Sequence, residues 1–189
     1  MRTDRFPSTL RVLLVVGALL AARNSAADEP VPFEARAGIA VARVAAQSWA
    51  PDAVLVWVEN DEEMDSTGVS ARWGYLYYSP ATERARVYSV REGKILLAEN
   101  LDLKFDAPQL ADDWIDSGRA LVAAETGAGA EFRNGSQGHL RTMILTRGPM
   151  HVTEPDRTTW TVVYAAEHAP SLFVVIDAQS GKVLRTWRG

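Results

Sequence analysis

The chain of 189 residues contains no cysteine and carries 20 basic and 24 acidic residues, for a formal net charge of −4. Without cysteine it can form neither a disulfide framework nor a thiolate metal site, so its core must hold it together. The acidic balance, with no basic stripe, argues against nucleic acids and anionic lipid surfaces as partners, because both would repel it.

Residues 1–27 are predicted to be a secretory signal peptide. Arginines at the start precede an apolar run from Val12 to Ala22, and Ser25-Ala26-Ala27 offers small residues for cleavage. The apolar run is short for a membrane span, so an uncleaved anchor is the less favoured interpretation. The segment holds four arginines and one aspartate, so its removal takes the net charge from −4 to −7. We expect a periplasmic or extracellular protein with no membrane span in the mature chain.

The first half of the mature chain is predicted to form a helix followed by an antiparallel meander. Apolar residues recur at three- and four-residue steps between Glu34 and Trp49, and Pro51 ends this helix. Alternation along the second predicted strand places Trp73, Tyr75 and Tyr77 on one face. The predicted strands are Val54–Val58, Trp73–Tyr78, Arg86–Val90 and Ile95–Leu97.

The second half repeats this order. Asp116 or Ser117 is predicted to cap a short helix that runs to about Glu125, and Gly127 and Gly129 stop it. The predicted strands are His139–Thr146, one carrying Trp160, Val162 and Tyr164 on one face, Leu172–Ile176 and Val183–Trp187. The fold class is therefore α+β, with two tandem units of a helix plus a three- to four-stranded antiparallel meander. Their sheets either join into one curved sheet or pack as two adjacent lobes.

Matched aromatic residues indicate an internal repeat. Trp73 and Tyr77 are four residues apart, and so are Trp160 and Tyr164. We expect these four side chains to have equivalent packing roles rather than to form a binding surface. The predicted boundaries are 28–104 for the first repeat and 105–189 for the second.

A turn in the second repeat has a clear physical role. Asp177 can accept hydrogen bonds from backbone N–H groups two or three residues further on, and Gly181 can adopt the positive φ that other residues resist. Both residues are predicted to be structural.

The segment from Trp160 to Tyr164, followed by Phe173-Val174-Val175-Ile176-Asp177-Ala178-Gln179-Ser180-Gly181-Lys182-Val183-Leu184, resembles a PepSY-type domain. The resemblance covers about residues 117–187 and is weaker over 34–100, where Arg91-Glu92-Gly93-Lys94 lacks the Asp-Ala pair. It implies tandem PepSY-like modules of helix and antiparallel sheet. It also implies a binding or inhibitory role, with a peptidase as one candidate target, and supplies no catalytic residues.

The segment from Glu59 to Asp65 holds five carboxylates in seven residues. It is interpreted as a hydrated loop between buried strands, with a cation or a basic partner as the functional alternative. The spacing does not match the twelve-residue calcium loop. The candidate partner-binding residues come from this loop and from a second loop at 148–158: Asp61, Glu62, Glu63, Asp65, His151 and Glu154.

Other patterns predict no catalytic residue, metal site or cofactor. His139, His151 and His168 lack the spacing of a helical zinc motif. Asp116 and its acidic neighbours suit a helix N-terminus. The segment Asn134-Gly135-Ser136 lacks the preceding strand of a nucleophile elbow and is interpreted as a flexible loop.

The sequence thus favours an exported, non-enzymatic module that binds a protein or peptide. An envelope hydrolase with an unrecognised site and a passive assembly element of an envelope complex are the alternatives. The oligomeric state is left open.

Overall fold

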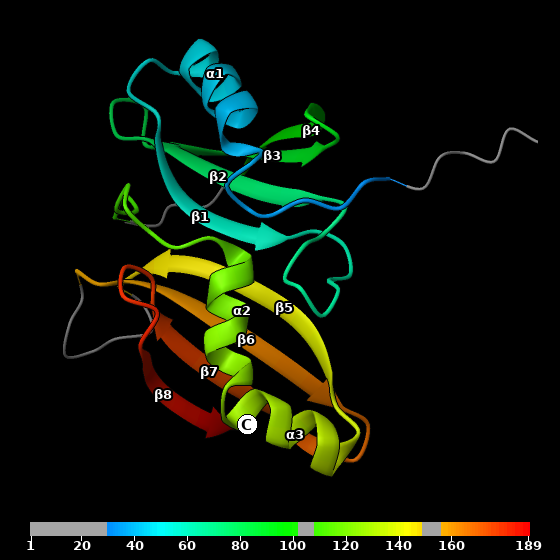
Figure 1. Ribbon diagram of the computed structural model, residues 1–189. Helices are drawn as coiled ribbons and strands as arrows, with labels where there is room; N and C mark the ends of the chain where they lie inside the picture. Colours follow the sequence, from blue (N-terminus) through cyan, green and yellow to red (C-terminus); the bar gives the residue numbers. More distant parts are fainter. Residues whose placement is uncertain (1–29, 102–107, 149–155) are drawn as a thin grey trace, which may run out of the picture.

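The structure is a computed structural model that describes residues 30–101, 108–148 and 156–189. Within these ranges eight strands form one antiparallel sheet in the order β4-β3-β2-β1-β5-β6-β7-β8, and three helices pack against it (Figure 1). The described chain is mostly β with some helix, compatible with the α+β class. Of the two predicted arrangements, the joined sheet is observed. The predicted signal peptide lies outside the described residues, and none of the described helices has the length and apolar character needed to cross a bilayer.

Helix α1 (Ile39–Trp49) begins later than predicted, because residues 34–38 form tight turns. The N–H groups of Ala37 and Ile39 donate to the carbonyls of Glu34 and Arg36, three residues back, at 3.1 and 3.2 Å. The buried face of α1 carries Ile39, Ala42 and Ala46. The repeat of apolar residues therefore identified the helix correctly but did not locate its first turn.

The first meander runs β1 (Val54–Asn60), β2 (Trp73–Ser79), β3 (Arg84–Arg91) and β4 (Lys94–Leu101). The predicted alternation in β2 is confirmed. Trp73, Tyr75 and Tyr77 enter the main core, while Leu76 and Tyr78 pack with a smaller apolar cluster on the opposite face. Both faces of this half of the sheet are thus partly apolar, although the helix covers only one.

The second half consists of α2 (Ser117–Glu125), α3 (Ala128–Ser136), β5 (His139–Arg147), β6 (Thr158–Ala166), β7 (Ala169–Asp177) and β8 (Val183–Arg188). Asp116 caps α2 as predicted, its side chain accepting a hydrogen bond from the Ser117 N–H at 2.8 Å. Trp160, Val162 and Tyr164 all belong to the main core.

Helix α3 was not predicted, and the interpretation of Asn134-Gly135-Ser136 as a flexible loop is wrong. Gly127 interrupts the helical path, but the chain resumes helical geometry at Ala128. Gly129 makes this possible, because a Cβ at that position would lie 2.5 Å from the Tyr164 hydroxyl oxygen. The glycine that suggested a helix stop instead permits close packing of α3 on β6.

Two glycines of α3 should respond in opposite directions to the same substitution. Gly129→Ala should lower the free energy of unfolding by about 1–3 kcal/mol, because the added methyl group overlaps Tyr164 and the Ala124 carbonyl. Gly135→Ala should raise it by up to about 1 kcal/mol, because its Cβ meets nothing within 4 Å and alanine favours helix. Urea denaturation of both variants measures the difference. If both substitutions changed the free energy of unfolding in the same direction and by the same amount, this placement of α3 would be contradicted.

The two meanders join through their first strands. Residues Trp57, Val58 and Glu59 of β1 pair with Thr146, Leu145 and Ile144 of β5. A second connection ties the start of the first half to the N-terminus of α2: the Ala35 N–H donates to Ser117 Oγ at 3.1 Å, and the Arg36 N–H donates to Asp116 Oδ1 at 3.0 Å. The two halves therefore share one sheet and one core.

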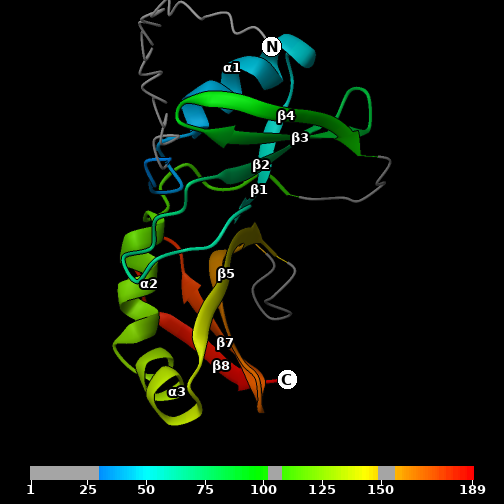
Figure 2. The same cartoon turned by 90° about the vertical axis from the view of Figure 1, so that its right-hand side faces the viewer.

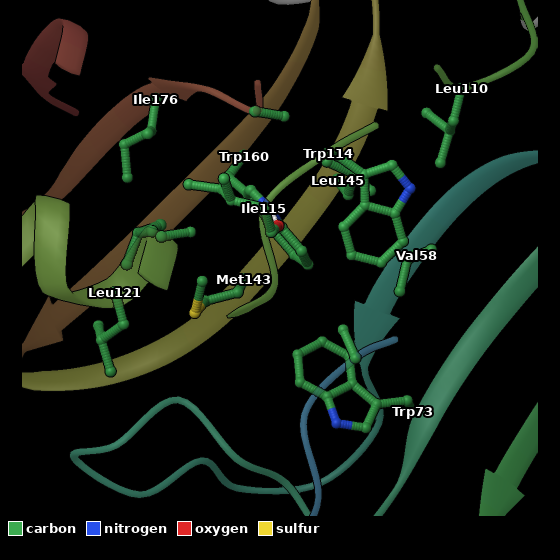
Figure 3. Close-up of a cluster of buried hydrophobic side chains, with 14 of the residues drawn as sticks. Val58, Trp73, Leu110, Trp114, Ile115, Leu121, Met143, Leu145, Trp160 and Ile176 are labelled. Atoms are coloured by element: carbon green, nitrogen blue, oxygen red, sulfur yellow. Dashed lines mark hydrogen bonds between the residues drawn. The ribbon is translucent and has the colours of Figure 1, made fainter. Parts of the chain in front are cut away.

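The two repeated tryptophans, Trp73 and Trp160, lie near the junction in one buried cluster, where Figure 3 also shows Trp114. Each repeat tryptophan is fully buried and donates from Nε1 to a backbone carbonyl preceding a helix, Trp73 to Phe33 and Trp160 to Ile115, both at 2.8 Å. Their rings meet edge to face at 6.3 Å. The expectation of equivalent packing roles is confirmed for the two tryptophans, within one shared core. Tyr77 and Tyr164 also belong to that core, but the hydroxyl of Tyr164 donates to Glu125 and the hydroxyl of Tyr77 has no such partner among the described residues.

The Asp177 turn forms as predicted. Asp177 Oδ1 accepts hydrogen bonds from the N–H groups of Gln179 and Ser180 at 3.1 and 2.7 Å, and Gly181 has a φ of +75°. The corresponding turn of the first half is tighter and uses Glu92 and Gly93, both with positive φ. The missing Asp-Ala pair in that half therefore corresponds to a shorter turn between β3 and β4.

Candidate binding groove

An open groove of 880 Å³ lies between the two halves of the molecule. One wall is the segment Asn60–Ser66, which leaves the end of β1. The other wall is formed by the facing residues of α2 and α3, and the start of β5 forms the floor between them. Figure 2 shows the β1–β2 connection reaching toward α2, away from the paired part of the sheet. We call this hollow the central groove.

The wall formed by the β1–β2 connection is well anchored. Ser70 is fully buried and forms a two-way backbone bridge with Phe33, at 2.9 and 3.1 Å. Its hydroxyl donates to the carbonyls of Glu62 and Arg72 at 3.2 and 3.0 Å. Ser70 therefore anchors this connection to Phe33, while Glu63, Asp65, Ser66 and Thr67 are exposed, as expected for a hydrated loop.

Asp65 fixes the far end of this wall. Its Oδ1 accepts hydrogen bonds from the Thr67 N–H and Oγ1, both at 2.7 Å, and from the Val69 N–H at 3.3 Å. Burial pushes the pKa of Asp65 up, but these hydrogen bonds outweigh it and hold the pKa below its usual value. Asp65 therefore shapes the loop and stays ionised.

The five carboxylates of this region have different environments. Glu59 belongs to β1, and burial raises its pKa. Glu62 accepts a hydrogen bond from Arg91 at 2.5 Å, which lowers the pKa of Glu62. Asp61 accepts from the Ser89 hydroxyl and lies 3.8 Å from Arg72 Nε. Glu63 is exposed and forms no ion pair within the described ranges, so it is the carboxylate most available to a partner.

The wall on the helical side is built around Glu125. The buried Tyr164 hydroxyl donates to Glu125 Oε1 at 2.7 Å, and Arg133 Nη2 pairs with Oε2 at 2.5 Å. Burial, reinforced by Glu125, raises the pKa of Tyr164 well above its usual range, so the hydroxyl keeps its proton. This arrangement holds α2, α3 and β6 in register beside the groove.

The start of β5 forms the floor. The Asn60 side chain lies beside it: Asn60 Oδ1 accepts from the Met143 N–H at 2.7 Å and from Thr142 Oγ1 at 2.9 Å. Asn60 Nδ2 donates to the carbonyl of Glu62 at 2.8 Å and approaches that of Arg141 at 3.5 Å. Thus Asn60 both ends β1 and turns the acidic wall away from β5.

The structure brings four predicted partner-binding residues, Asp61, Glu62, Glu63 and Asp65, together on one wall of the groove. The other two, His151 and Glu154, lie outside the described residues. Sequence reasoning missed Asn60, Glu125, Arg133 and Arg141, which carry no motif and meet only through the fold.

In the ranges that the structure describes, no group of three or more acidic or histidine side chains is placed to hold a metal ion.

No protein-family profile matches the chain, and no curated protein matches it. Among solved structures, it is similar to a candidate lipoprotein from Clostridium difficile 630, with 14% sequence identity and a TM-score of 0.50 over 78% of this chain and 90% of that one. The YpeB C-terminal domain of Bacillus megaterium also aligns, at 8% identity and a TM-score of 0.31 over 85% of this chain and 69% of that one. The first likeness shows a shared fold, whereas the second is too low to do so.

Proposed function

We propose that the mature chain is an exported, non-enzymatic module that binds a protein or peptide partner in the central groove. The observation that carries this proposal is the groove itself, which lies where the two repeats meet and has walls from both. Its volume of 880 Å³ falls in the range of about 300–1,000 Å³ that ligand sites occupy. Its walls are held by hydrogen bonds and ion pairs, so a partner would meet a prepared surface.

Two further observations support the class and the location. The second half carries the Trp-led strand and the Asp-Ala turn of a PepSY-type domain, and each half is a helical segment followed by a four-stranded meander. The fold is shared with a candidate lipoprotein, and residues 1–27 have the pattern of a secretory signal peptide. A tandem PepSY-like protein of the envelope would explain both observations. Inhibition of a peptidase is one form that such binding would take.

Affinity capture from an envelope extract tests this function. Exchanging the whole β1–β2 connection for a short turn is unsuitable, because Ser70 ties that connection to Phe33 and the exchange should destabilise the fold. Point variants are cleaner: Glu63→Lys reverses an exposed charge, and Ser66→Trp fills the groove. Glu99→Lys, on the outer strand β4, is the matched charge control.

We expect the wild type and Glu99→Lys to retain the same proteins. Glu63→Lys should weaken capture by about fivefold, the size of an exposed charge effect of about 1 kcal/mol. Ser66→Trp should weaken capture further by steric exclusion. Equal capture by all four proteins, each with a normal melting temperature, would contradict binding in the groove.

A further inference from the structure

Strand β5 extends beyond the strand that flanks it on the groove side. From His139 to Arg147, β5 pairs with β6, with a register shift between Leu140 and Thr142 that interrupts the regular alternation at Arg141. On the other side, β1 pairs only with Ile144, Leu145 and Thr146. The first part of β5, His139–Met143, therefore has a neighbouring strand on one edge only. On the other edge the Met143 N–H is bonded to Asn60, and residues 139–142 line the central groove. Resting on the function proposed above, we propose that the partner binds as an extended segment that adds to this open edge.

Asn60 shows that the edge faces the groove with its backbone groups. Its side-chain amide accepts from the Met143 N–H at 2.7 Å and lies 3.5 Å from the Arg141 carbonyl, as the backbone of a continuing strand would. In an antiparallel ladder, one residue directs both its N–H and its C=O to the same neighbour, and the next such residue is two positions along. Beyond Asn60, the groove lies alongside the edge from Arg141 toward His139.

The described residues that follow Asn60 do not fill that place. After Asn60 the segment Asp61–Ser66 diverges to form the opposite wall, where the Asp61 N–H donates to the Arg72 carbonyl at 3.0 Å instead of pairing with β5. An exposed edge is a template for another strand, and natural sheets cover or blunt such edges. Here the edge faces the acidic segment across the central groove, and we infer that a single extended segment fits between them. Main-chain pairing of this kind is an established mode of peptide recognition.

The charges of the walls select a basic segment. Asp61, Glu62, Glu63, Asp65 and Glu125 line the groove against Arg133 and Arg141. Arg72 and Arg91 pair with Asp61 and Glu62 from behind, and Arg133 pairs with Glu125. Within the described ranges Glu63 forms no ion pair, so its carboxylate is left for a lysine or arginine side chain of the bound segment. Asp65 also forms no ion pair there and adds negative charge to the wall, although its Oδ1 is held by Thr67 and Val69.

A defined peptide tests strand addition. The probe is acetyl-Lys-Val-Lys-Val-Lys-Val-amide, and the control is the same peptide with glutamate in place of lysine. Two further forms of the probe are methylated on backbone nitrogens, one at every valine and the other at every lysine. Affinity is measured by calorimetry, and backbone amide exchange is followed by NMR at residues 139–143 and, as a reference edge, on β8. Because alternate residues face β5, methylation of only one set removes its hydrogen bonds.

We expect the basic peptide to bind at least tenfold more tightly than the acidic one, and to slow amide exchange at 139–143 but not on β8. One methylated form should lose at least tenfold in affinity while the other changes less than threefold. The proposal is overturned by absence of binding, by binding without protection of 139–143, or by equal effects of the two methylated forms. A dimer that protects the same amides without peptide also overturns it. If any of these results accompanies groove-dependent capture from the extract, strand addition fails while the binding function stands.

Discussion

Replacing Trp160 with alanine should lower the free energy of unfolding by about 3–5 kcal/mol, the usual cost of removing a large buried aromatic side chain. Trp160 is fully buried, and its ring meets those of Trp73 and Trp114 edge to face at 6.3 and 5.7 Å. The substitution also leaves the Ile115 carbonyl without the Nε1 donor at 2.8 Å. Urea denaturation of purified protein measures the loss.

Trp187→Ala is the matched control, because Trp187 lies on the outer strand β8, is partly exposed, and has only Phe173, stacked at 4.9 Å, and the Arg185 guanidinium, 5.0 Å from the ring centroid, as ring contacts among the described residues. Trp187→Ala should lower the free energy of unfolding by about 1 kcal/mol.

A double-mutant cycle of Trp73→Ala and Trp160→Ala then tests the shared core. We expect a coupling of about 0.5–1.5 kcal/mol. Strictly additive effects would mean that the two repeats have independent cores.

Replacing Asp177 with alanine should cost about 2–3 kcal/mol, the range for losing hydrogen bonds to a charged group. Asp177 Oδ1 accepts from the N–H groups of Gln179 and Ser180 and from the Ser180 hydroxyl, while Oδ2 pairs with Arg157. The side chain is only 8% exposed, so water replaces few of these contacts. Thermal denaturation of Asp177→Ala at pH 7 measures the effect.

The pH dependence of this difference has a definite sign. Burial raises the pKa of Asp177, but hydrogen bonds from Ser180 and the Arg157 guanidinium outweigh it and hold the pKa below 3.8. Stability from the ionised group is therefore present above the unfolded pKa and is lost as the pH falls through the lower folded pKa. The stability difference between the wild type and Asp177→Ala should begin to shrink as the pH falls below about 4 and should continue to shrink as the pH falls through the folded pKa. Asp156→Ala, whose side chain is 92% exposed, should change stability by less than about 0.5 kcal/mol. A gap of constant size down to pH 2 would contradict this role.

Sequence reasoning predicted best those features that depend on near neighbours. The alternation Trp73, Tyr75, Tyr77 placed β2 correctly because period-two burial needs only the strand itself. The Asp177 turn was equally local, since its acceptor lies two and three residues from its donors. Helix α3 was missed because its glycines resemble helix stops, and the reason for Gly129 is Tyr164, which is far along the sequence.

The groove depends on distant pairing and could be predicted only in part. The acidic run indicated one wall, but its relation to the other walls is set by the pairing of β1 with β5. The contact that shapes the floor joins Asn60 to Thr142, 82 residues apart. Neither periodicity nor a sequence motif predicts a contact between residues so far apart in the sequence. The chain therefore revealed the candidate residues of the acidic loop, while the open edge of β5 required the fold.

Site-specific photocrosslinking tests the groove as a binding site most directly. A benzophenone amino acid at Ser66, inside the groove, is compared with one at the exposed Thr186 on β8, in an envelope extract. We expect irradiation to produce a discrete adduct from position 66, mapped to an extended basic segment of the partner, and no such adduct from position 186. An adduct with the same protein from position 186, and none from position 66, would contradict binding in the central groove.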